Sequence, residues 1–293
     1  MKTILRINGI VFVLSLIGLT TFGLIAKDEI RNQLHYEHYI ENYDASEIDQ
    51  LKINADNRNV IINESTTNQI SIEFYISEMD RYTLTLNNEI FSLEIKANWF
   101  ESIFYSTTIF NISLDPALVT IKISAPANVL SSLDILTTNG TINMDNLSVD
   151  SVFAKTTNGT IKLKNATFED GQLISSNGNI DVQYISGSNL TLRTSNGEIK
   201  GDHITIDELK ANTSNGHIKF SDLSSFKIET TSSNGNINLR INGIFEDYKT
   251  IVTTANGTIK INDNKSFSGT YHSDKANSVS AITSNGSIYL YFE

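Results

Sequence analysis

Two aspartates and a set of lysines are the residues of this sequence whose types and spacing could do chemistry. Asp181 and Asp202 are expected on neighbouring strands, and a pair of close carboxylates is what a glycan-cleaving enzyme needs. No further acid joins them at that spacing, so the sequence favours two solvated surface acids. The serines and threonines have no recurring histidine base, and no phosphate loop or nucleophile elbow is present. The sequence therefore predicts no enzyme, no catalytic residue and no cofactor.

Basic side chains recur at outward positions on a chain whose net charge is −11. They are Lys162, Lys164, Lys200, Lys219, Arg240 and Lys260. A basic stripe on an acidic protein suits an anionic envelope polymer, either a teichoic-acid-like polyphosphate or an acidic glycan. The alternative is that these lysines serve solubility and discourage edge pairing of strands. The overall negative charge argues against a nucleic-acid partner.

Aromatic residues and histidines supply two weaker candidates. Trp99 and Phe100 belong to a dense aromatic segment, residues 98–105, which reads either as an exposed contact loop or as a plug for the end of the core. His35 and His38 stand three apart, but two ligands without a third make a poor metal site. The chain has no cysteine, so thiolate metal sites and disulfides are excluded. No metal site is predicted.

An Asn-Gly pair recurs through the second half of the chain and determines which elements carry these residues. The in-register pairs are Asn139-Gly140, Asn158-Gly159, Asn177-Gly178, Asn196-Gly197, Asn215-Gly216, Asn234-Gly235, Asn256-Gly257 and Asn285-Gly286. The first five intervals are 19 residues each, and the last two are 22 and 29. Thr or Ser stands two before each Asn, and Ile always stands three after it. Repeats of this length indicate stacked structural units.

Apolar residues two apart after each pair, such as Ile161 and Leu163, predict a strand with one buried face. Further apolar slots lie eight and fifteen after the Asn. Each unit therefore reads as a strand, an Asn-Gly corner, a second strand and a looser return. Asn and Gly are expected at the corner because both tolerate positive φ. Asn-Gly also favours antiparallel hairpins. Identical residues in every slot favour a parallel solenoid instead, because like then stacks on like about 4.8 Å apart.

The N-terminal residues predict a membrane anchor. Lys2 and Arg6 precede an uncharged run, residues 7–26, that is long enough to span a bilayer. The basic side is expected in the cytoplasm, which leaves the bulk of the chain outside. A cleaved signal peptide is the alternative, although Leu24 suits a cleavage site poorly.

The fold class expected is all-β, a right-handed parallel β-solenoid (β-helix) of 19-residue coils after one transmembrane helix. Residues 1–27 are assigned to the anchor, 28–45 to a stalk or short helix, 46–136 to a β-rich cap with irregular first coils, and 137–293 to the repeat solenoid. Asp56 to Val60 is read as a degenerate corner, and Ile288 to Phe292 as the closing strand.

The Thr/Ser-x-Asn-Gly-x-Ile repeat, together with the segment Ala125 to Val129 and the run Leu133 to Gly140, resembles the bacterial putative-adhesin family of unknown function. The resemblance covers roughly residues 45–293. The chain is also similar to membrane-anchored adhesin-like proteins encoded beside cell-envelope stress systems of Gram-positive bacteria. This implies a place at the envelope and no catalytic residues.

Three functions remain open at this point. The first is an extracellular adhesin-like or scaffold protein that binds an envelope polymer or a protein partner. The second is an accessory sensor that acts through a neighbouring membrane protein, and the third, a glycan-active enzyme, lacks its carboxylate cluster. The predicted location is a single-pass cell-membrane protein with its N-terminus in the cytoplasm.

Overall fold

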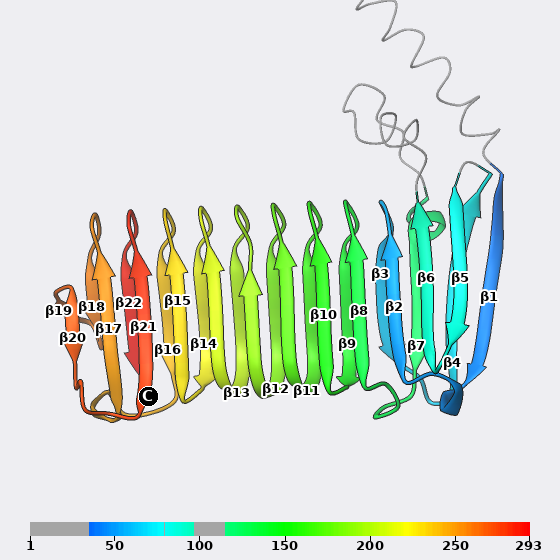
Figure 1. Ribbon diagram of the computed structural model, residues 1–293. Helices are drawn as coiled ribbons and strands as arrows, with labels where there is room; N and C mark the ends of the chain where they lie inside the picture. The colour runs from blue at the N-terminus through cyan, green and yellow to red at the C-terminus, as the bar shows by residue number, and fades with distance from the viewer. Residues whose placement is uncertain (1–34, 79, 97–114) are drawn as a thin grey trace, which may run out of the picture.

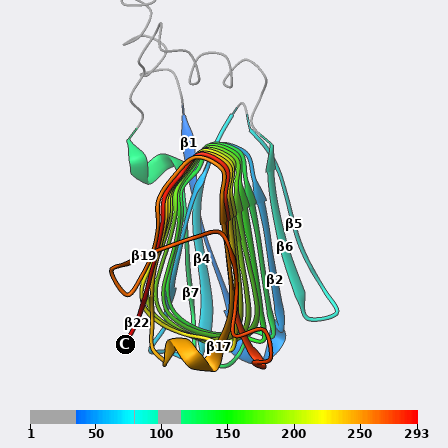
Figure 2. The same cartoon turned by 90° about the vertical axis from the view of Figure 1, so that its left-hand side faces the viewer.

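The computed structural model describes residues 35–78, 80–96 and 115–293. They form a flattened β-solenoid in which nearly parallel coils lie side by side along one axis (Figure 1). The view along the axis shows the coils superimposed as elongated loops around a narrow interior (Figure 2). The central strands pair in parallel throughout, which confirms the stack and excludes an antiparallel meander.

Each coil places one strand on either side of the Asn-Gly corner. In the central coils the second strand continues around the opposite bend, so that one long strand serves both sides. The register is residue on equivalent residue: Ile161 pairs with Ile180, and Ile180 with Ile199. The two sides are called sheet one and sheet two below, and together they are one continuous hydrogen-bonded sheet.

Sheet one contains the strands that follow the corners. In spatial order they are β1 (Tyr36–Asp44), β4 (Gln69–Ser77), β7 (Thr120–Ala125), β3 (Asn59–Glu64), β9 (Ile142–Ser148), the first parts of β11 (Ile161–Ser175), β12 (Ile180–Arg193) and β13 (Ile199–Thr213), then β14 (Ile218–Ser224), β16 (Ile237–Ile241), β22 (Ile288–Phe292), β18 (Ile259–Ile261) and β19 (Asn264–Ser266).

Sheet two contains the strands that precede the corners. Their spatial order is β5 (Arg81–Asn87), β6 (Ile90–Lys96), β2 (Gln50–Ala55), β8 (Ser132–Thr137), β10 (Ser151–Thr156), the second parts of β11, β12 and β13, then β15 (Lys227–Ser232), β21 (Asn277–Thr283), β17 (Tyr248–Thr254) and β20 (Gly269–Tyr271). Short 3₁₀ turns lie at Ala45–Glu47, Pro116–Val119 and Phe245–Asp247.

Both ends of the stack depart from chain order. The coil of β2 and β3 lies between the coil of β6 and β7 and the coil of β8 and β9. At the other end, the coil of β21 and β22 lies between the coil of β15 and β16 and the coil of β17 and β18. The prediction that Ile288 to Phe292 closes the stack is therefore wrong. These residues form a strand, but it is an internal one.

Antiparallel strands terminate the parallel stack. At the N-terminal end β4 pairs antiparallel with β7 and β1 with β4, while β5 pairs antiparallel with β6. At the C-terminal end β19 and β20 pair antiparallel with β18 and β17. Short or reversed edge strands limit further pairing with other chains. Strand β1 occupies part of the range predicted to be a stalk, so the structured region begins earlier than the sequence suggested.

The core runs the length of the stack as columns of equivalent apolar residues. The Ile that stands three after each corner Asn is buried in all eight repeats, with Ile259 the most exposed of them at 3%. The slots at five and eight after the Asn are buried too, for example Leu163 and Ala166. The inward pattern read from the sequence is therefore confirmed.

The predicted transmembrane helix at residues 7–26 lies outside the described residues. Among the residues that are described, no helix has the length and apolar character needed to cross a bilayer.

Candidate functional site

The corner asparagines form one hydrogen-bonded ladder along the edge of the solenoid. Each side-chain amide donates to the Oδ1 of its neighbour, with Nδ2–Oδ1 distances of 2.6 Å from Asn177 to Asn158 and 2.7 Å from Asn215 to Asn196. At the N-terminal end Asn139 donates to Asn57. Asp56 to Val60 is therefore a corner without glycine, as predicted. At the C-terminal end the ladder runs through Asn285 before Asn256, following the inserted coil.

In the central coils, the Ser or Thr that stands two residues before the corner Asn is buried and both donates and accepts a hydrogen bond. Thr194 Oγ1 donates to the Gly178 carbonyl of the preceding coil at 3.0 Å and accepts from the Gly197 amide of its own corner at 3.2 Å. Ser175 and Ser232 make the equivalent bonds. These hydroxyls therefore link each corner to the preceding one by hydrogen bonds.

The corner glycines are required for a reason other than the one expected. The described glycines with positive φ are Gly187 and Gly243, and neither belongs to a corner pair, so the positive-φ explanation is wrong. Instead the corners stack backbone on backbone. A Cβ on Gly197 would lie 2.0 Å from the Gly178 carbonyl oxygen, and one on Gly216 would lie 1.7 Å from the Gly197 oxygen. Only glycine permits this close approach.

A second periodic row, not recognised in the sequence, does adopt left-handed backbone conformation. It consists of the residues seven after the corner Asn, which we call the bulge row: Asn146, Asn165, Tyr184, His203 and Asp222, with φ between 50° and 56°. Here the strand bulges, so that inward residues are three apart instead of two, as with Leu163 and Ala166. That odd spacing was visible in the sequence and could have revealed the row.

The six predicted basic residues all lie on the outer face of sheet one, in two parallel rows. The first row holds the residues that stand four after each corner Asn; in spatial order along the stack they are Asn143, Lys162, Asp181, Lys200, Lys219, Asn238, Tyr289 and Lys260. The second row holds the residues that stand six after each corner Asn; in the same spatial order they are Asp145, Lys164, Gln183, Asp202, Ser221, Arg240 and Tyr291. The structure therefore brings Lys200 beside Lys219 but places Asp181 between Lys162 and Lys200.

These basic groups differ in whether a carboxylate already pairs with them. Lys200 Nζ lies 3.0 Å from Glu198, and Arg240 lies 2.9 Å from Glu293 and over the Tyr291 ring. Within residues 35–78, 80–96 and 115–293, no ion pair involves Lys162, Lys164, Lys219 or Lys260. The first three of these are exposed cations available to an anionic ligand.

The two candidate carboxylates lie on adjacent coils but are not directly opposite each other. Asp181 is opposite Lys200, and Asp202 is opposite Gln183 on one side and Ser221 on the other. Asp202 accepts from the Ser221 hydroxyl at 2.7 Å and lies 3.1 Å from His203. The Ser221 hydrogen bond, with a smaller contribution from His203, holds the pKa of the Asp202 carboxyl below its usual value.

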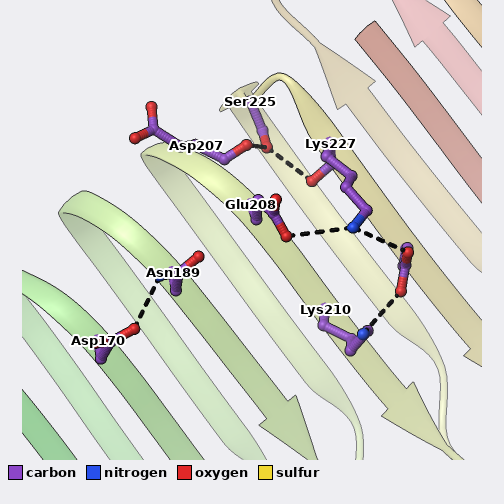
Figure 3. A network of polar contacts seen from close by, with 8 residues as sticks. Asp170, Asn189, Asp207, Glu208, Lys210, Ser225 and Lys227 are labelled. Carbon is purple, nitrogen blue, oxygen red and sulfur yellow. Dashed lines mark hydrogen bonds and ion pairs between the residues drawn. The ribbon is translucent and has the colours of Figure 1, made fainter. Parts of the chain in front are cut away.

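The outer face of sheet two carries a charge network of a different kind (Figure 3). Lys210 lies 3.0 Å from Glu229, and Lys227 lies 3.3 Å from Glu208 and 3.6 Å from Glu229. The bond from Lys210 lowers the pKa of Glu229, and the bond to Glu208 raises the pKa of Lys227. Because each cation here has an anionic partner, this network leaves no free cation for a ligand.

Two open cavities lie at the bend opposite the corners. One, of about 400 Å³, is lined by Asp49, Asp150 and Glu169, which would repel an anion. The other, of about 300 Å³, lies between Ile206, Tyr248 and the exposed Phe226. Neither cavity contains the predicted lysines.

The remaining candidates do not form sites in the described part of the chain. His38 stacks on Tyr75 with ring centroids 4.4 Å apart and lies 3.2 Å from Glu73. No group of three or more His, Asp or Glu side chains among the described residues has the geometry to hold a metal ion. Trp99 and Phe100 lie outside the described residues, so their role stays a prediction.

The fold and its repeat have counterparts in known proteins. The Toastrack DUF4097 family model matches residues 48–290, which is most of the chain. The chain belongs to this family. The match covers the stack except β1 and the last residues of β22, and it includes the inserted coils near both ends. It agrees with the resemblance found in the sequence and assigns no ligand.

Solved structures also match this chain, at low identity. A protein from Parabacteroides distasonis described as a putative adhesin aligns with a TM-score of 0.54 at 12% identity, covering 87% of this chain and 97% of that one. A second, from the same species and described as a putative lipid binding protein, aligns with a TM-score of 0.52 at 17% identity, covering 88% and 97%. At these identities the likeness shows the fold alone. No curated protein sequence matches this chain.

Proposed function

We propose that this toastrack protein is an extracellular, adhesin-like binding module of the bacterial envelope, and that the outer face of sheet one binds an anionic polymer. The observation that carries the proposal is the set of exposed, unpaired cations Lys162, Lys164 and Lys219 on that face of an acidic protein. The predicted membrane anchor at residues 7–26 holds the module at the cell surface in this proposal.

The arrangement of charge supports a polymer more than a compact ligand. The residues four and six after each corner Asn recur on successive coils, about 4.8 Å apart along the axis. The cations are therefore spread over several coils and not gathered into one pocket. A long anionic chain can contact such a row at many points, and each contact contributes modestly because the face is solvent-exposed.

Charge reversal tests the proposal. The full-length protein with Lys162→Glu, Lys164→Glu and Lys219→Glu should lose retention on isolated bacterial cell walls in a sedimentation assay. A matched triple variant, Lys155→Glu, Lys249→Glu and Lys275→Glu, changes net charge equally but lies on sheet two and a C-terminal loop. It should be retained better than the sheet-one variant.

Equal loss in both triple variants would mean that only net charge matters, and unchanged retention of the sheet-one variant would contradict the proposal. If the wild-type protein is not retained but co-purifies with a membrane protein, the accessory-sensor function replaces it. Turnover of a glycan panel would instead indicate an enzyme.

A further inference from the structure

One member of the bulge row has the wrong residue type for its backbone conformation. Left-handed φ is tolerated by Asn and Asp, and a bulky aromatic residue there is an outlier that costs free energy. Tyr184 has φ 55° in the slot where two coils carry Asn and another carries Asp. The Tyr184 residue is 49% exposed, so burial in the core does not offset that cost. A strained aromatic residue kept on the surface indicates a binding role.

The ring of Tyr184 is braced on one side by a histidine that is itself fixed. The Tyr184 and His203 ring centroids are 4.7 Å apart with a 32° interplanar angle. His203 Nδ1 lies 3.1 Å from Asp202, and His203 Nε2 lies 3.1 Å from Asp222 on the next coil. Asp222 in turn accepts from the Asn242 amide at 2.5 Å. The aromatic pair therefore has a defined orientation before any ligand arrives.

The surroundings of Tyr184 combine cations, hydroxyls and carboxylates. Lys164 lies on the coil before Tyr184, opposite Gln183 in the row next to the bulge row. Lys200 lies on the coil after Tyr184 but farther away, opposite Asp181, and it already pairs with Glu198. On the other side runs a row of hydroxyl residues nine after the corner Asn, in which Thr167 and Ser186 are hydrogen-bonded at 2.9 Å. On the coil before Tyr184 the bulge slot holds the shorter Asn165, whose amide donates to Asp145 at 2.8 Å.

This set of groups matches an acidic sugar. An aromatic ring packs against the apolar face of a pyranose, a lysine pairs with its carboxylate, and hydroxyl and carboxylate side chains bond to its hydroxyls. A polyphosphate without rings would use only the lysines. We infer that Tyr184 and His203 form a sugar-binding subsite for an acidic glycan that lies along the outer face of sheet one. The inference deepens the proposed function and rests on it, because it names the polymer class.

The test compares two anionic probes with the full-length protein in detergent micelles. Polygalacturonate oligosaccharides supply acidic sugar rings, and inorganic polyphosphate supplies charge alone. Tyr184→Asn installs the residue that Asn146 and Asn165 provide in neighbouring coils, so the fold should be preserved. Its affinity for polygalacturonate should fall about tenfold, equivalent to about 1.4 kcal/mol, while its affinity for polyphosphate stays within about twofold. Its midpoint of thermal unfolding should not decrease.

Tyr184→Phe keeps the ring and should retain polygalacturonate binding, which guards against a folding defect in the first variant. Unchanged polygalacturonate affinity of Tyr184→Asn would overturn the subsite. Wild-type binding to polyphosphate but not to polygalacturonate would also overturn it, while leaving the proposed function in place. Binding to neither probe would remove both.

Discussion

At the residue scale, three residues per coil explain why the repeat is so constant. Asn supplies the ladder, Ser or Thr satisfies two backbone groups of adjoining corners, and Gly allows the corners to touch. These roles depend on one another, because the hydroxyl bonds to the glycine carbonyl that the next glycine packs against. The sequence showed that these residues recur, but the reason for the glycine became clear only from the coil spacing.

Replacing a corner glycine should destabilise the stack. In Gly197→Ala the new Cβ must avoid a backbone oxygen 2.0 Å away, so the neighbouring coils have to separate locally. We expect the free energy of unfolding to fall by about 1–3 kcal/mol in a chemical denaturation experiment. Gly269→Ala is the control, since a Cβ at that position meets nothing within 4 Å. Equal effects of the two changes would rule out the close-approach explanation.

Removing a corner hydroxyl should leave two buried backbone groups without partners. Thr194→Val retains the shape of the side chain but loses the bonds to the Gly178 carbonyl and the Gly197 amide. A loss of about 1–3 kcal/mol in the free energy of unfolding is expected. Thr194→Ser should be nearly neutral because Ser175 and Ser232 do the same in other coils. If valine is tolerated as well as serine, the hydroxyl has no structural role.

Asp134 should make stability depend on pH. Partial burial raises the pKa of its carboxyl, opposed by Lys52, and its Oδ1 has no hydrogen-bond partner. A raised carboxyl pKa means that the ionised form destabilises the folded state at neutral pH. This loss of stability shrinks as the pH falls through the folded-state pKa and is gone below the unfolded-state pKa. Asp134→Asn should therefore raise the midpoint of thermal unfolding at pH 7 but not at pH values where Asp134 is protonated. A constant difference at all pH values would contradict this.

At the element scale, each 19-residue coil is one structural unit, and its strands pair with those of the neighbouring coils in a single register. The sequence predicted the strands, the buried columns and the corners of residues 137–241, because two periodicities, 2 within a strand and 19 between coils, agree there. It predicted a β-rich cap over residues 46–136 but not the antiparallel pairing of β1, β4 and β5, which follows no repeat, nor that β1 belongs to the cap. The bulge row was missed because its residues share a conformation and not a residue type.

Excising one coil should preserve the fold. Deletion of residues 178–196 joins Asn177 to Gly197 and recreates an Asn-Gly corner one coil earlier. Because coils contribute roughly additively in a solenoid, circular dichroism should show intact β-structure with a modestly lower unfolding midpoint. Deletion of residues 178–195 leaves one extra residue, which moves every following side chain to the opposite face. That variant should not fold, and a folded one would mean that the register is not fixed by the period.

At the scale of the whole molecule, each inserted coil pairs with a terminal coil on one side and with a central coil on the other. The intervals of 22 and 29 residues between the last corners were a sign of irregularity, but period alone cannot give spatial order. The structure shows that residues 277–292 separate two coils that are consecutive in sequence. The coil of β17 and β18 has its parallel partners only in β21 and β22 among the described strands.

Truncation after residue 276 should therefore release more than the deleted residues. Without β21 and β22 the coil of β17 and β18 loses its contacts with the stack, so residues 242–276 should become sensitive to limited proteolysis. A stack that followed chain order would lose only its last coil and keep residues 248–261 protected. Mass spectrometry of the proteolytic fragments distinguishes the two results.

The central functional claim belongs to this scale: the outer face of sheet one, whose cations are spread over many coils, binds an anionic polymer. Lysine acetylation of the full-length protein, with and without bound cell-wall polymer, tests the claim most directly when each site is quantified by mass spectrometry. The account predicts that the polymer protects Lys162, Lys164 and Lys219 while Lys155, Lys249 and Lys275 stay as reactive as before. Equal reactivity of the sheet-one lysines with and without polymer, or protection confined to sheet two, would contradict it.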